Sequence, residues 1–378
     1  MKFSTLAVHA AGIGVLGDVV PSIHTSTTFK QPVTGGPGTW EYQRGANPTR
    51  AVAQQVLAAL ENAQHGFMFS SGMAATAAAL SLLKQGAHVI ASAAVYGGTY
   101  RFLTQELPRR SQSATFLADL EELSDADFTP ETAMVFIESP TNPTLRVYDI
   151  ARLADLAHRN GALLVVDNTF LTPYLQNPLD LGADIVVHSA TKYLAGHADL
   201  IAGVAVTNDD DLAAELGFAQ NTLGAILSPT DSFRLIQGVK TLALRMERQQ
   251  SNTVRLLEWL GTHPGVEALY YPGSHSPEEA AIQARQARGI GAVFSLELAP
   301  DVDQDAFVSA LGIFTYAVSL GGVESLICKP ASMTHEAFSA EDHAAAGIPA
   351  QLLRLAVGVE DIDDLIADLD QALSKARK

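Results

Sequence analysis

Cysteine is nearly missing from this sequence, which has one such residue, Cys328, among 378. A single thiol cannot form an intrachain disulfide, so we expect no disulfide framework and a reducing, cytoplasmic location. Cys328 stands in the segment ICKP with no metal-ligand spacing around it, and we interpret it as a structural thiol. Neither an HExxH segment nor a pair of CxxC segments occurs, so the sequence supports no zinc site.

Long apolar runs and basic residues are also scarce. No run approaches the roughly 18 apolar residues that a membrane helix needs. Lysine and arginine together number 24 against 41 acidic residues, and the formal net charge of -17 argues against nucleic acid or an anionic membrane as partner. With 47% hydrophobic and 17% charged residues, the chain is typical of an ordered globular protein. Its length allows two domains and a sizeable core.

The N-terminal segment, residues 1–45, shows no clear helical period and predicts an extended arm lying on something larger. Its first 18 residues faintly resemble a signal peptide, but His9 and two glycines interrupt the short apolar core. Gly12 to Gly17 match the dinucleotide pattern GxGxxG, which requires a helix directly afterwards. Residues 18–21 read DVVP and cannot form that helix, so we interpret the match as chance.

Strand and helix patterns alternate from residue 48 onward. Apolar spacing predicts helices over residues 48–62, 72–83 and 150–158, and buried strands over 88–92, 134–138, 163–167 and 185–188. Continuous apolar strands separated by helices imply a mostly parallel sheet covered on both faces. Ligands of such sheets bind beyond the carboxyl ends of the strands, which here carry Asp167, Ser189 and Lys192.

A long helical pattern over residues 232–260 leads out of this sheet into a smaller α+β unit. Strands over 292–298 and 353–359 and a helix over 362–376 are expected there. We therefore predict an arm over residues 1–45, a large domain over 46–240 and a C-terminal α+β domain over 241–378.

Lys192 is the one lysine among eight that directly follows a buried apolar strand. Burying an ammonium group without a partner is costly, and proteins accept that cost for a lysine that serves as an amine nucleophile. The alternative is a solvated loop lysine with no role. Ser189 and Lys192 also match the SxxK pattern of penicillin-binding proteins, but the companion SDN and KTG segments are missing, which leaves a serine hydrolase as a distant alternative.

Pyridoxal phosphate (PLP) needs an amine, a carboxylate on its ring nitrogen, an anion cradle and a ring to stack on. Taken singly, the candidates have simpler interpretations: Asp167 as a helix cap, Tyr96 as core and Ser71 as a turn. His188 and His197 flank the lysine and are interpreted as packing or hydrogen-bonding residues. Together the candidates form a coherent cofactor set at the ends of successive strands: Lys192, Asp167, Tyr96, Ser71, Gly72, Met73, Ser189 and Thr191.

These residues resemble those of the Cys/Met-metabolism enzymes of PLP fold type I, which include cystathionine γ-synthase, cystathionine β- and γ-lyases and methionine γ-lyase. The resemblance runs nearly end to end. Its segments are YQRGANPTR at 42–50, SSGMAA at 70–75, YGGTYR at 96–101, ESPTNP at 138–143, VDNTF at 166–170, HSATKYLAGHAD at 188–199, SLGGVESL at 319–326, PASMTH at 330–335 and LLRLAVG at 352–358.

The resemblance implies the fold and a role for each matching residue. The fold would be an α/β, PLP-dependent transferase fold of type I, with a mostly parallel seven-stranded sheet between helices and a smaller C-terminal α+β domain. Lys192 would link to the cofactor, Asp167 would hold its ring nitrogen, Tyr96 would stack on the ring, and the phosphate would be held by Gly72, Met73, Ser189 and Thr191. Arg354 would clamp the substrate carboxylate, helped by Asn142 and Ser319.

The resemblance also implies an assembly. Tyr42 and Arg44 would reach the active site of a neighbouring subunit and complete its phosphate cradle. The expected assembly is a homotetramer, built as a dimer of dimers.

Two departures bear on the reaction. γ-Synthases and typical γ-lyases carry a glutamate directly before SLGG, where this chain has Val318, as in methionine γ-lyases and some bacterial β-lyases. Methionine γ-lyases have a cysteine where this chain has Gly98, and Arg101 matches a position associated with the distal carboxylate of cystathionine. The resemblance favours α,β-elimination from cystathionine and related thioethers, giving a thiol, a keto acid and ammonia. α,γ-Elimination, cystathionine γ-synthase and, more distantly, methionine γ-lyase are the alternatives.

Overall fold

A sheet of seven strands forms the centre of the computed structural model, which describes residues 1–12, 17–34, 36, 38–336 and 338–377. The strand order is β1-β7-β6-β5-β4-β2-β3, and only β7 runs antiparallel to its neighbours. The strands are β1 (His65–Phe69), β2 (His88–Ser92), β3 (Ser113–Leu117), β4 (Thr132–Glu138), β5 (Leu163–Asp167), β6 (Ile185–Ser189) and β7 (Gly203–Thr207). The predicted fold class, a mostly parallel seven-stranded α/β sheet, is confirmed.

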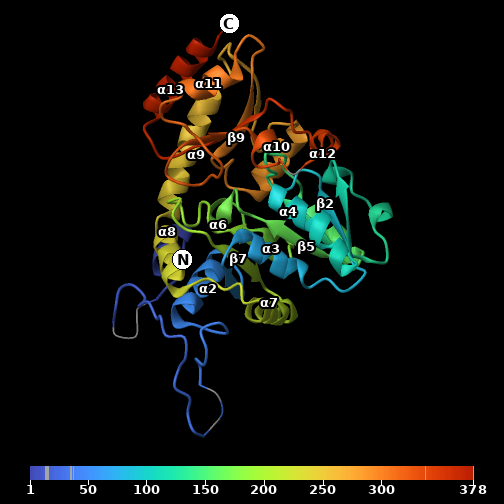
Figure 1. Cartoon of the computed structure of the whole chain (residues 1–378), viewed down its shortest axis with the longest axis vertical. Coiled ribbons are helices and arrows are strands. Elements are labelled where there is room, and N and C mark those ends of the chain that lie inside the picture. The colour runs from blue at the N-terminus through green and yellow to red at the C-terminus, as the bar shows by residue number, and fades with distance from the viewer. Residues whose placement is uncertain (13–16, 35, 37, 337, 378) are drawn as a thin grey trace.

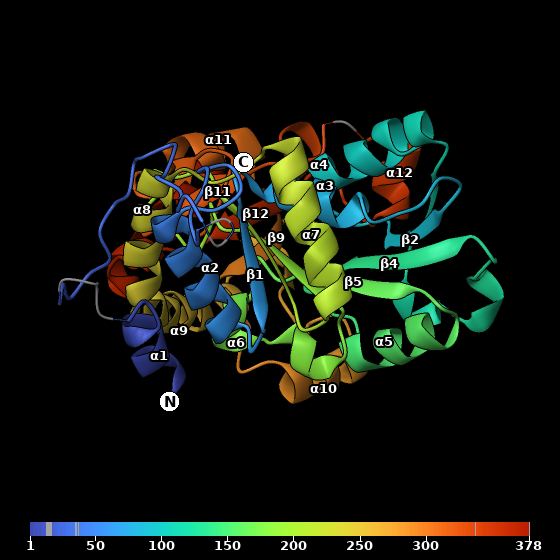
Figure 2. The same ribbon diagram turned by 90° about the horizontal axis from the view of Figure 1, so that it is seen from below.

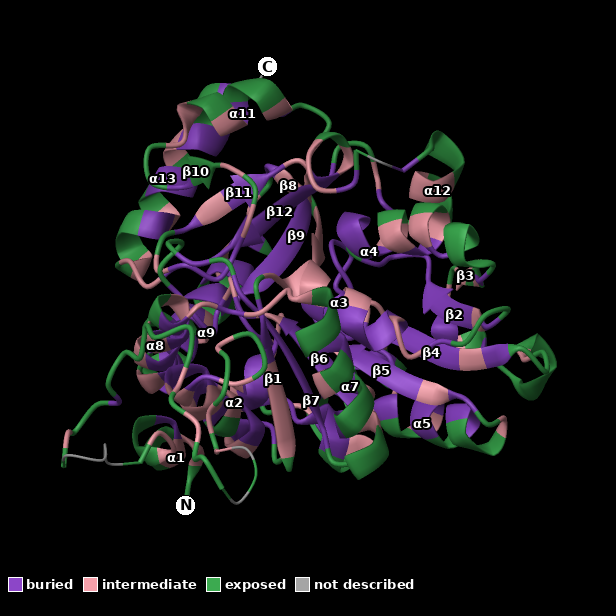
Figure 3. Cartoon of the chain, turned by 60° about the horizontal axis from the view of Figure 1, so that its bottom comes forward, coloured by how far each residue is buried: buried purple, intermediate pink, exposed green. Residues whose placement is uncertain are grey.

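Helices cover both faces of this sheet, as its continuously apolar strands require. In β4, Met134 and Phe136 pack on the face of α3 (Gly72–Leu80) and α7 (Asp210–Leu223), whereas Val135 and Ile137 pack on the opposite face. That face carries α2 (Pro48–Leu60), α5 (Ile150–Arg159) and α8 (Pro229–Lys240). Figure 2 shows α7 and α5 on opposite sides of the sheet, and Figure 3 shows its strands buried and the outer helix surfaces exposed.

A second sheet, of order β10-β11-β12-β9-β8, belongs to the C-terminal part of the chain. Helix α9 (Leu242–Leu260) runs from the first sheet toward the second (Figure 1), whose core it shares with α11 (Gln304–Ala310) and α13 (Ile362–Ala376). The strands are β8 (Val266–Tyr270), β9 (Val293–Leu298), β10 (Thr315–Tyr316), β11 (Leu326–Cys328) and β12 (Leu353–Ala356). The shorter helices are α4 (Gly97–Arg101), α6 (Thr172–Leu175), α10 (Pro277–Gln286) and α12 (Ala340–Ala345). The domain boundary at residue 240 stays a prediction.

The single long helix predicted over residues 232–260 is wrong, because the chain bends at Thr241 between α8 and α9. The Gly238 carbonyl accepts hydrogen bonds from Nη2 of Arg245, at 2.8 Å, and from the Thr241 hydroxyl, at 3.1 Å. Gly238 must lack a side chain, since a Cβ there would lie 2.3 Å from the Ala195 carbonyl oxygen. Gly238 therefore permits the end of α8 to pack closely against the loop after Lys192.

The N-terminal segment is only partly the predicted arm. Helix α1 (Phe3–His9) packs against α2, α8 and α9 and buries Ala7 in the first core, so the prediction of an arm from residue 1 is wrong there. Phe3, Leu6 and Ala7 recur at helical spacing, a signal too short to stand out in the sequence. The segment before α2 projects from the body in Figure 1. Residues 13–16 of the GxGxxG match lie outside the described residues, and the described residues from 17 to 47 form no helix.

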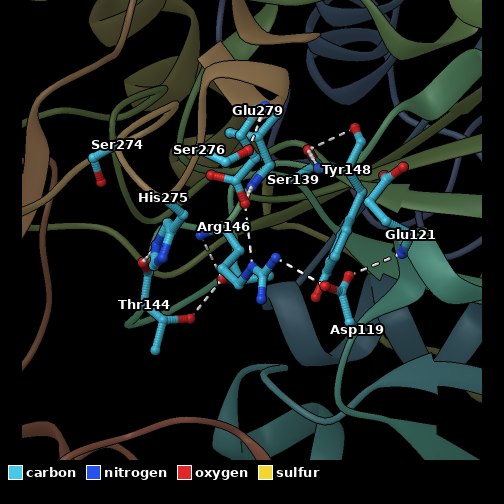
Figure 4. Close-up of polar contacts among 12 residues, drawn as sticks. Asp119, Glu121, Ser139, Thr144, Arg146, Tyr148, Ser274, His275, Ser276 and Glu279 are labelled. Carbon is cyan, nitrogen blue, oxygen red and sulfur yellow. Dashed lines mark hydrogen bonds and ion pairs between the residues drawn. The ribbon is translucent and has the colours of Figure 1, made fainter. Parts of the chain in front are cut away.

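A polar cluster connects α10 to the edge of the first sheet (Figure 4). The guanidinium of Arg146, from the segment after β4, donates to Glu279 of α10 at 3.1 Å and to Asp119 at 2.9 Å. The same Glu279 oxygen accepts from the Val147 amide at 3.3 Å, and the His275 ring bonds the Thr144 carbonyl oxygen at 2.7 Å. Glu279 is 3% exposed, so this cluster is a buried polar contact that holds α10 against the segment after β4.

Candidate active site

A cavity of about 390 Å³ lies beyond the carboxyl ends of the parallel strands, as the strand rule requires. It contains most of the residues that the sequence singled out. Those that line it are Ser71, Gly72, Met73, Tyr96, Asn142, Asp167, Ser189, Thr191, Lys192, Val318, Ser319 and Arg354. Segments that are far apart in sequence thus meet at one site.

Lys192 lies in the turn after β6, and its side chain extends to the second sheet. Nζ donates a 2.7 Å hydrogen bond to the hydroxyl of Ser319. Burial, followed by the positive charge of Arg354, lowers the pKa of Lys192 to about 8. Near neutral pH, a much larger share of this amine is therefore uncharged than of an ordinary lysine.

Asp167 ends strand β5 and accepts two hydrogen bonds at Oδ1, from the Thr169 amide at 2.9 Å and from the Thr169 hydroxyl. Burial raises the pKa of Asp167, and these two hydrogen bonds oppose that rise. The Thr169 oxygen also accepts from the Ser189 amide, at 2.8 Å, so it joins the ends of β5 and β6. The sequence analysis gave Thr169 no role, although a hydroxyl two residues after an aspartate is a common turn signal.

The two histidines near Lys192 have the hydrogen-bonding roles predicted for them. His188 Nε2 lies 2.6 Å from Oε1 of Glu61, and both side chains are completely buried. The same Glu61 oxygen accepts from Nδ2 of Asn168, at 3.0 Å. His197 bonds the Ala195 carbonyl oxygen at 2.8 Å.

The N-terminus of α3 lies at the cavity, where the sequence predicts an anion cradle. Ser71 caps the helix by accepting from the Ala74 amide at 3.1 Å, which leaves the N–H groups of Gly72 and Met73 without intrahelical acceptors. A Cβ on Gly72 would lie 2.8 Å from Cβ of Ser189, so only glycine permits α3 to approach β6 this closely. The Thr191 hydroxyl donates to the Ala202 carbonyl oxygen at 3.2 Å.

Tyr96 precedes α4 and presents a ring that is 44% exposed. Its amide donates a 2.6 Å hydrogen bond to Oε1 of Glu138, and a Cβ on Gly98 would lie 2.5 Å from its ring. Glu138 ends β4 directly beside Asp167. Burial, followed by the charge of Asp167, raises the pKa of Glu138 well above its usual value, and hydrogen bonds from the Tyr96 and Asn142 amides oppose that rise. The strand-end rule that found Asp167 could also have found Glu138.

Arg354 lies on β12, 3% exposed, and two of its nitrogens have fixed partners. Nη1 donates to Oδ1 of Asn142 and Nη2 donates to the Ser319 carbonyl oxygen, both at 2.9 Å. Within the described residues its Nε, although buried, has no hydrogen-bond acceptor. A guanidinium held in this way beside a cavity is suited to bind a carboxylate.

Three predicted residues lie outside the main cavity. Arg101 lines a second cavity of about 470 Å³, which shares Tyr96 and Val318 with the first. Tyr42 and Arg44 line neither cavity; the Arg44 guanidinium lies 5.5 Å from the centre of the Tyr42 ring, and its Nε donates to Asn221 at 3.2 Å. They do not reach the cavity of their own chain.

The donor set fits pyridoxal phosphate. It offers an amine with a lowered pKa, a carboxylate at the end of β5, two helix N–H groups and an exposed ring, all around one cavity. Nowhere in the described ranges is a group of His, Cys, Asp and Glu side chains arranged to hold a metal ion. None of the helices in those ranges combines the length and hydropathy needed to cross a membrane.

Comparison with known proteins agrees with this geometry. Residues 4–374 match the family described as Cys/Met metabolism PLP-dependent enzyme. The chain is 44% identical to a cystathionine γ-lyase of Bacillus subtilis, over 99% of each chain. It is 45% identical to a cystathionine β-lyase of Lactococcus lactis, over 95% of each chain. A crystal structure of cystathionine γ-lyase from Lactobacillus plantarum, complexed with L-serine, superposes with a TM-score of 0.96 at 41% identity, covering 100% of this chain and 99% of the other.

Proposed function

The chain belongs to the Cys/Met metabolism PLP-dependent enzyme family, and we propose that it cleaves the carbon–sulfur bond of cystathionine and related thioethers by α,β-elimination. The observation that carries this proposal is the contact of Lys192 with Ser319, which holds an amine of lowered pKa beside the carboxylate-binding Arg354. Relatives named as cystathionine γ-lyase and β-lyase are 44% and 45% identical to this chain. Cleavage of a carbon–sulfur bond is what the two activities share.

The cofactor is pyridoxal phosphate, which, when bound, withdraws electrons from the bonds at the substrate α-carbon. Lys192 would hold its aldehyde carbon, and Asp167 would hold the proton on its ring nitrogen. The amides of Gly72 and Met73 and the hydroxyl of Ser189 would hold the phosphate.

Arg354 positions the substrate by its carboxylate. Its guanidinium lines the main cavity, so a substrate carboxylate can bind it there. Asn142 and Ser319 accept from Nη1 and Nη2 and thereby fix the orientation of the guanidinium. This clamp places the substrate α-carbon near Lys192, which lines the same cavity.

Lys192 and Tyr96 move the protons. Only a neutral amine can accept the proton from the α-carbon. With a pKa of about 8, Lys192 is neutral in a larger share of molecules than an ordinary lysine and is therefore the better base. Tyr96 lines both cavities, so its hydroxyl is available to protonate the sulfur that leaves. The products are a thiol, a keto acid and ammonia.

Val318 supports α,β-elimination. It is 54% exposed and lines both cavities, so the substrate's outer half meets an apolar side chain where typical γ-lyases carry a glutamate. α,γ-Elimination and γ-replacement on an O-acylhomoserine are the alternatives, since both use the same lysine and clamp.

The assembly that we propose is a homotetramer with active sites shared between paired subunits. Its support is the position of Tyr42 and Arg44, whose side chains are exposed and line neither cavity of their own chain. A guanidinium from a neighbouring subunit would complete the phosphate cradle. One buried cysteine supports a reducing location, the cytoplasm.

A product assay tests the reaction. Incubation with L-cystathionine is expected to yield pyruvate and homocysteine, identified by mass spectrometry. Oxobutyrate and cysteine would indicate α,γ-elimination instead, and turnover only with an O-acylhomoserine would indicate the synthase. Lys192→Ala should abolish turnover, whereas Lys84→Ala, at an exposed lysine, should not change it.

A further inference from the structure

The second cavity extends the active site outward from Tyr96 and Val318. It has a volume of about 470 Å³ and is lined by one cationic and one anionic residue, Arg101 and Glu336. The two cavities also share Thr334. A substrate held at Arg354 therefore extends its far end toward Arg101 and Glu336.

Two features of the fold place Glu336 at this cavity. Gly97, at the start of α4, lets the backbone of Thr334 come close, since a Cβ on Gly97 would lie 2.3 Å from the Thr334 carbonyl oxygen. The next residue, His335, is completely buried and bonds the Asn142 carbonyl oxygen through Nε2 at 3.1 Å. Glu336 follows this anchored pair, while Arg101 lies four residues after Gly97, one turn along α4.

Both charges are available to a ligand. In the part of the chain that the structure describes, neither Arg101 nor Glu336 forms an ion pair, with each other or with any other side chain. Val318, at the position where typical γ-lyases carry a glutamate, lines the same cavity without a charge. Glu336 thus supplies to this cavity a carboxylate that position 318 lacks.

We propose that Glu336 binds the ammonium group at the far end of the substrate, whose carboxylate the family resemblance assigns to Arg101. This inference rests on the proposed function, because it requires a thioether whose outer half is itself an amino acid. A carboxylate and a guanidinium lining one cavity match the two charges of such a zwitterion. Glu336 is then a specificity-determining residue that favours cystathionine over thioethers without the outer amine.

The test compares L-cystathionine with its two analogues that lack the outer amine, S-(3-carboxypropyl)-L-cysteine and S-(2-carboxyethyl)-L-homocysteine. With the holoenzyme, Glu336→Gln should raise KM for cystathionine about tenfold, the loss expected for one charge-assisted hydrogen bond, and leave kcat within about twofold. KM for whichever analogue is cleaved should stay within about twofold of the wild-type value. Glu336→Asp keeps the charge, so its KM for cystathionine should lie between the values of the wild type and of Glu336→Gln.

Glu341→Gln is the matched control, because Glu341 is an exposed glutamate of α12 that lines neither cavity. It should leave every KM unchanged. An equal rise of KM for cystathionine and for the analogue overturns the assignment, as does an unchanged KM in an active Glu336→Gln enzyme. If the wild-type enzyme releases no product from cystathionine, the proposed function fails and this inference fails with it.

Discussion

The side-chain amine of Lys192 donates a 2.7 Å hydrogen bond to the hydroxyl of Ser319, 127 positions later in the chain. Lys192 follows a strand of the first sheet, whereas Ser319 lies between two strands of the second. Ser319 has a φ of +96°, which a residue with a side chain rarely adopts, and its carbonyl accepts from Arg354. The amine and the carboxylate clamp therefore form one unit, which exists only when both sheets are in place.

The amine of Lys192 should titrate near pH 8 in the cofactor-free protein. Half of it is then neutral at pH 8, against under about 1% of an ordinary lysine with a pKa near 10.4. Each lysine can be acylated with limiting reagent at a series of pH values and its yield measured by mass spectrometry. The yield should rise with a midpoint near pH 8 at Lys192 and at a higher pH at exposed Lys84.

Arg354→Gln should shift this midpoint upward, because it removes the positive charge that helps to lower the pKa of Lys192. Arg109→Gln, at an exposed arginine far from the cavity lining, should not shift it. A Lys192 midpoint equal to that of Lys84 would contradict the prediction.

Asp167→Asn should weaken cofactor binding and lower kcat/KM by about 10² or more, a typical cost of losing a positioned acid–base partner. Asparagine keeps an oxygen for Thr169 but cannot stabilise a protonated ring nitrogen by charge. Absorbance titration gives the cofactor Kd, and the product assay gives kcat/KM.

Asp155→Asn serves as the control for Asp167→Asn, since Asp155 is an exposed acid of α5. Both quantities should match those of the wild type in this variant. Wild-type kcat/KM in Asp167→Asn would show that another group holds the ring nitrogen.

Subunits that carry Arg44→Ala and Lys192→Ala should restore activity to each other. If Arg44 acts in the neighbouring site, a mixed dimer has one intact site, and random pairing recovers about a quarter of wild-type activity from two inactive parents. The unfractionated co-expressed mixture should show this recovery, whereas mixed dimers purified through two separate affinity tags should show about half of wild-type activity, since one site in two is intact.

The pair Arg354→Ala and Lys192→Ala is the control for this experiment. Both residues line the same cavity of one chain, so a mixed dimer has no intact site and should stay inactive. If the pair of Arg44→Ala and Lys192→Ala is as inactive as this control, Arg44 does not act in the neighbouring site.

Glu279→Gln should reduce stability by about 2 kcal/mol, because a buried carboxylate that accepts from Arg146 and from a backbone amide loses its charge. The thermal unfolding midpoint of the holoenzyme should fall by a few degrees. Glu267→Gln, at an exposed glutamate of β8, should leave the midpoint unchanged. A fall of equal size in both variants would rule out a specific role for the cluster in Figure 4.

Local patterns in the sequence determined the central sheet. Strands β2 and β5 and helix α13 begin and end where apolar periodicity predicts, because a buried strand or an amphipathic helix needs its apolar residues at a fixed spacing. The same reasoning found Asp167 and Lys192, since strand ends in a parallel sheet share one edge. With the resemblance added, it also found Arg354 and Ser319.

Contacts between distant segments decided the rest. The helical pattern is interrupted at Thr241, where Arg245 and the Thr241 hydroxyl bond the Gly238 carbonyl, and Gly238 packs against the loop after Lys192, a contact that no local spacing records. The pKa of Glu138 is raised because folding buries it beside Asp167, and Glu336 lines one cavity with Arg101 because Gly97 of α4 admits the Thr334 backbone. The sequence alone thus determined which residues end the strands. Only the tertiary structure decided which of them are buried together, bond to one another or line one cavity, since charge and burial depend on neighbours across the whole fold.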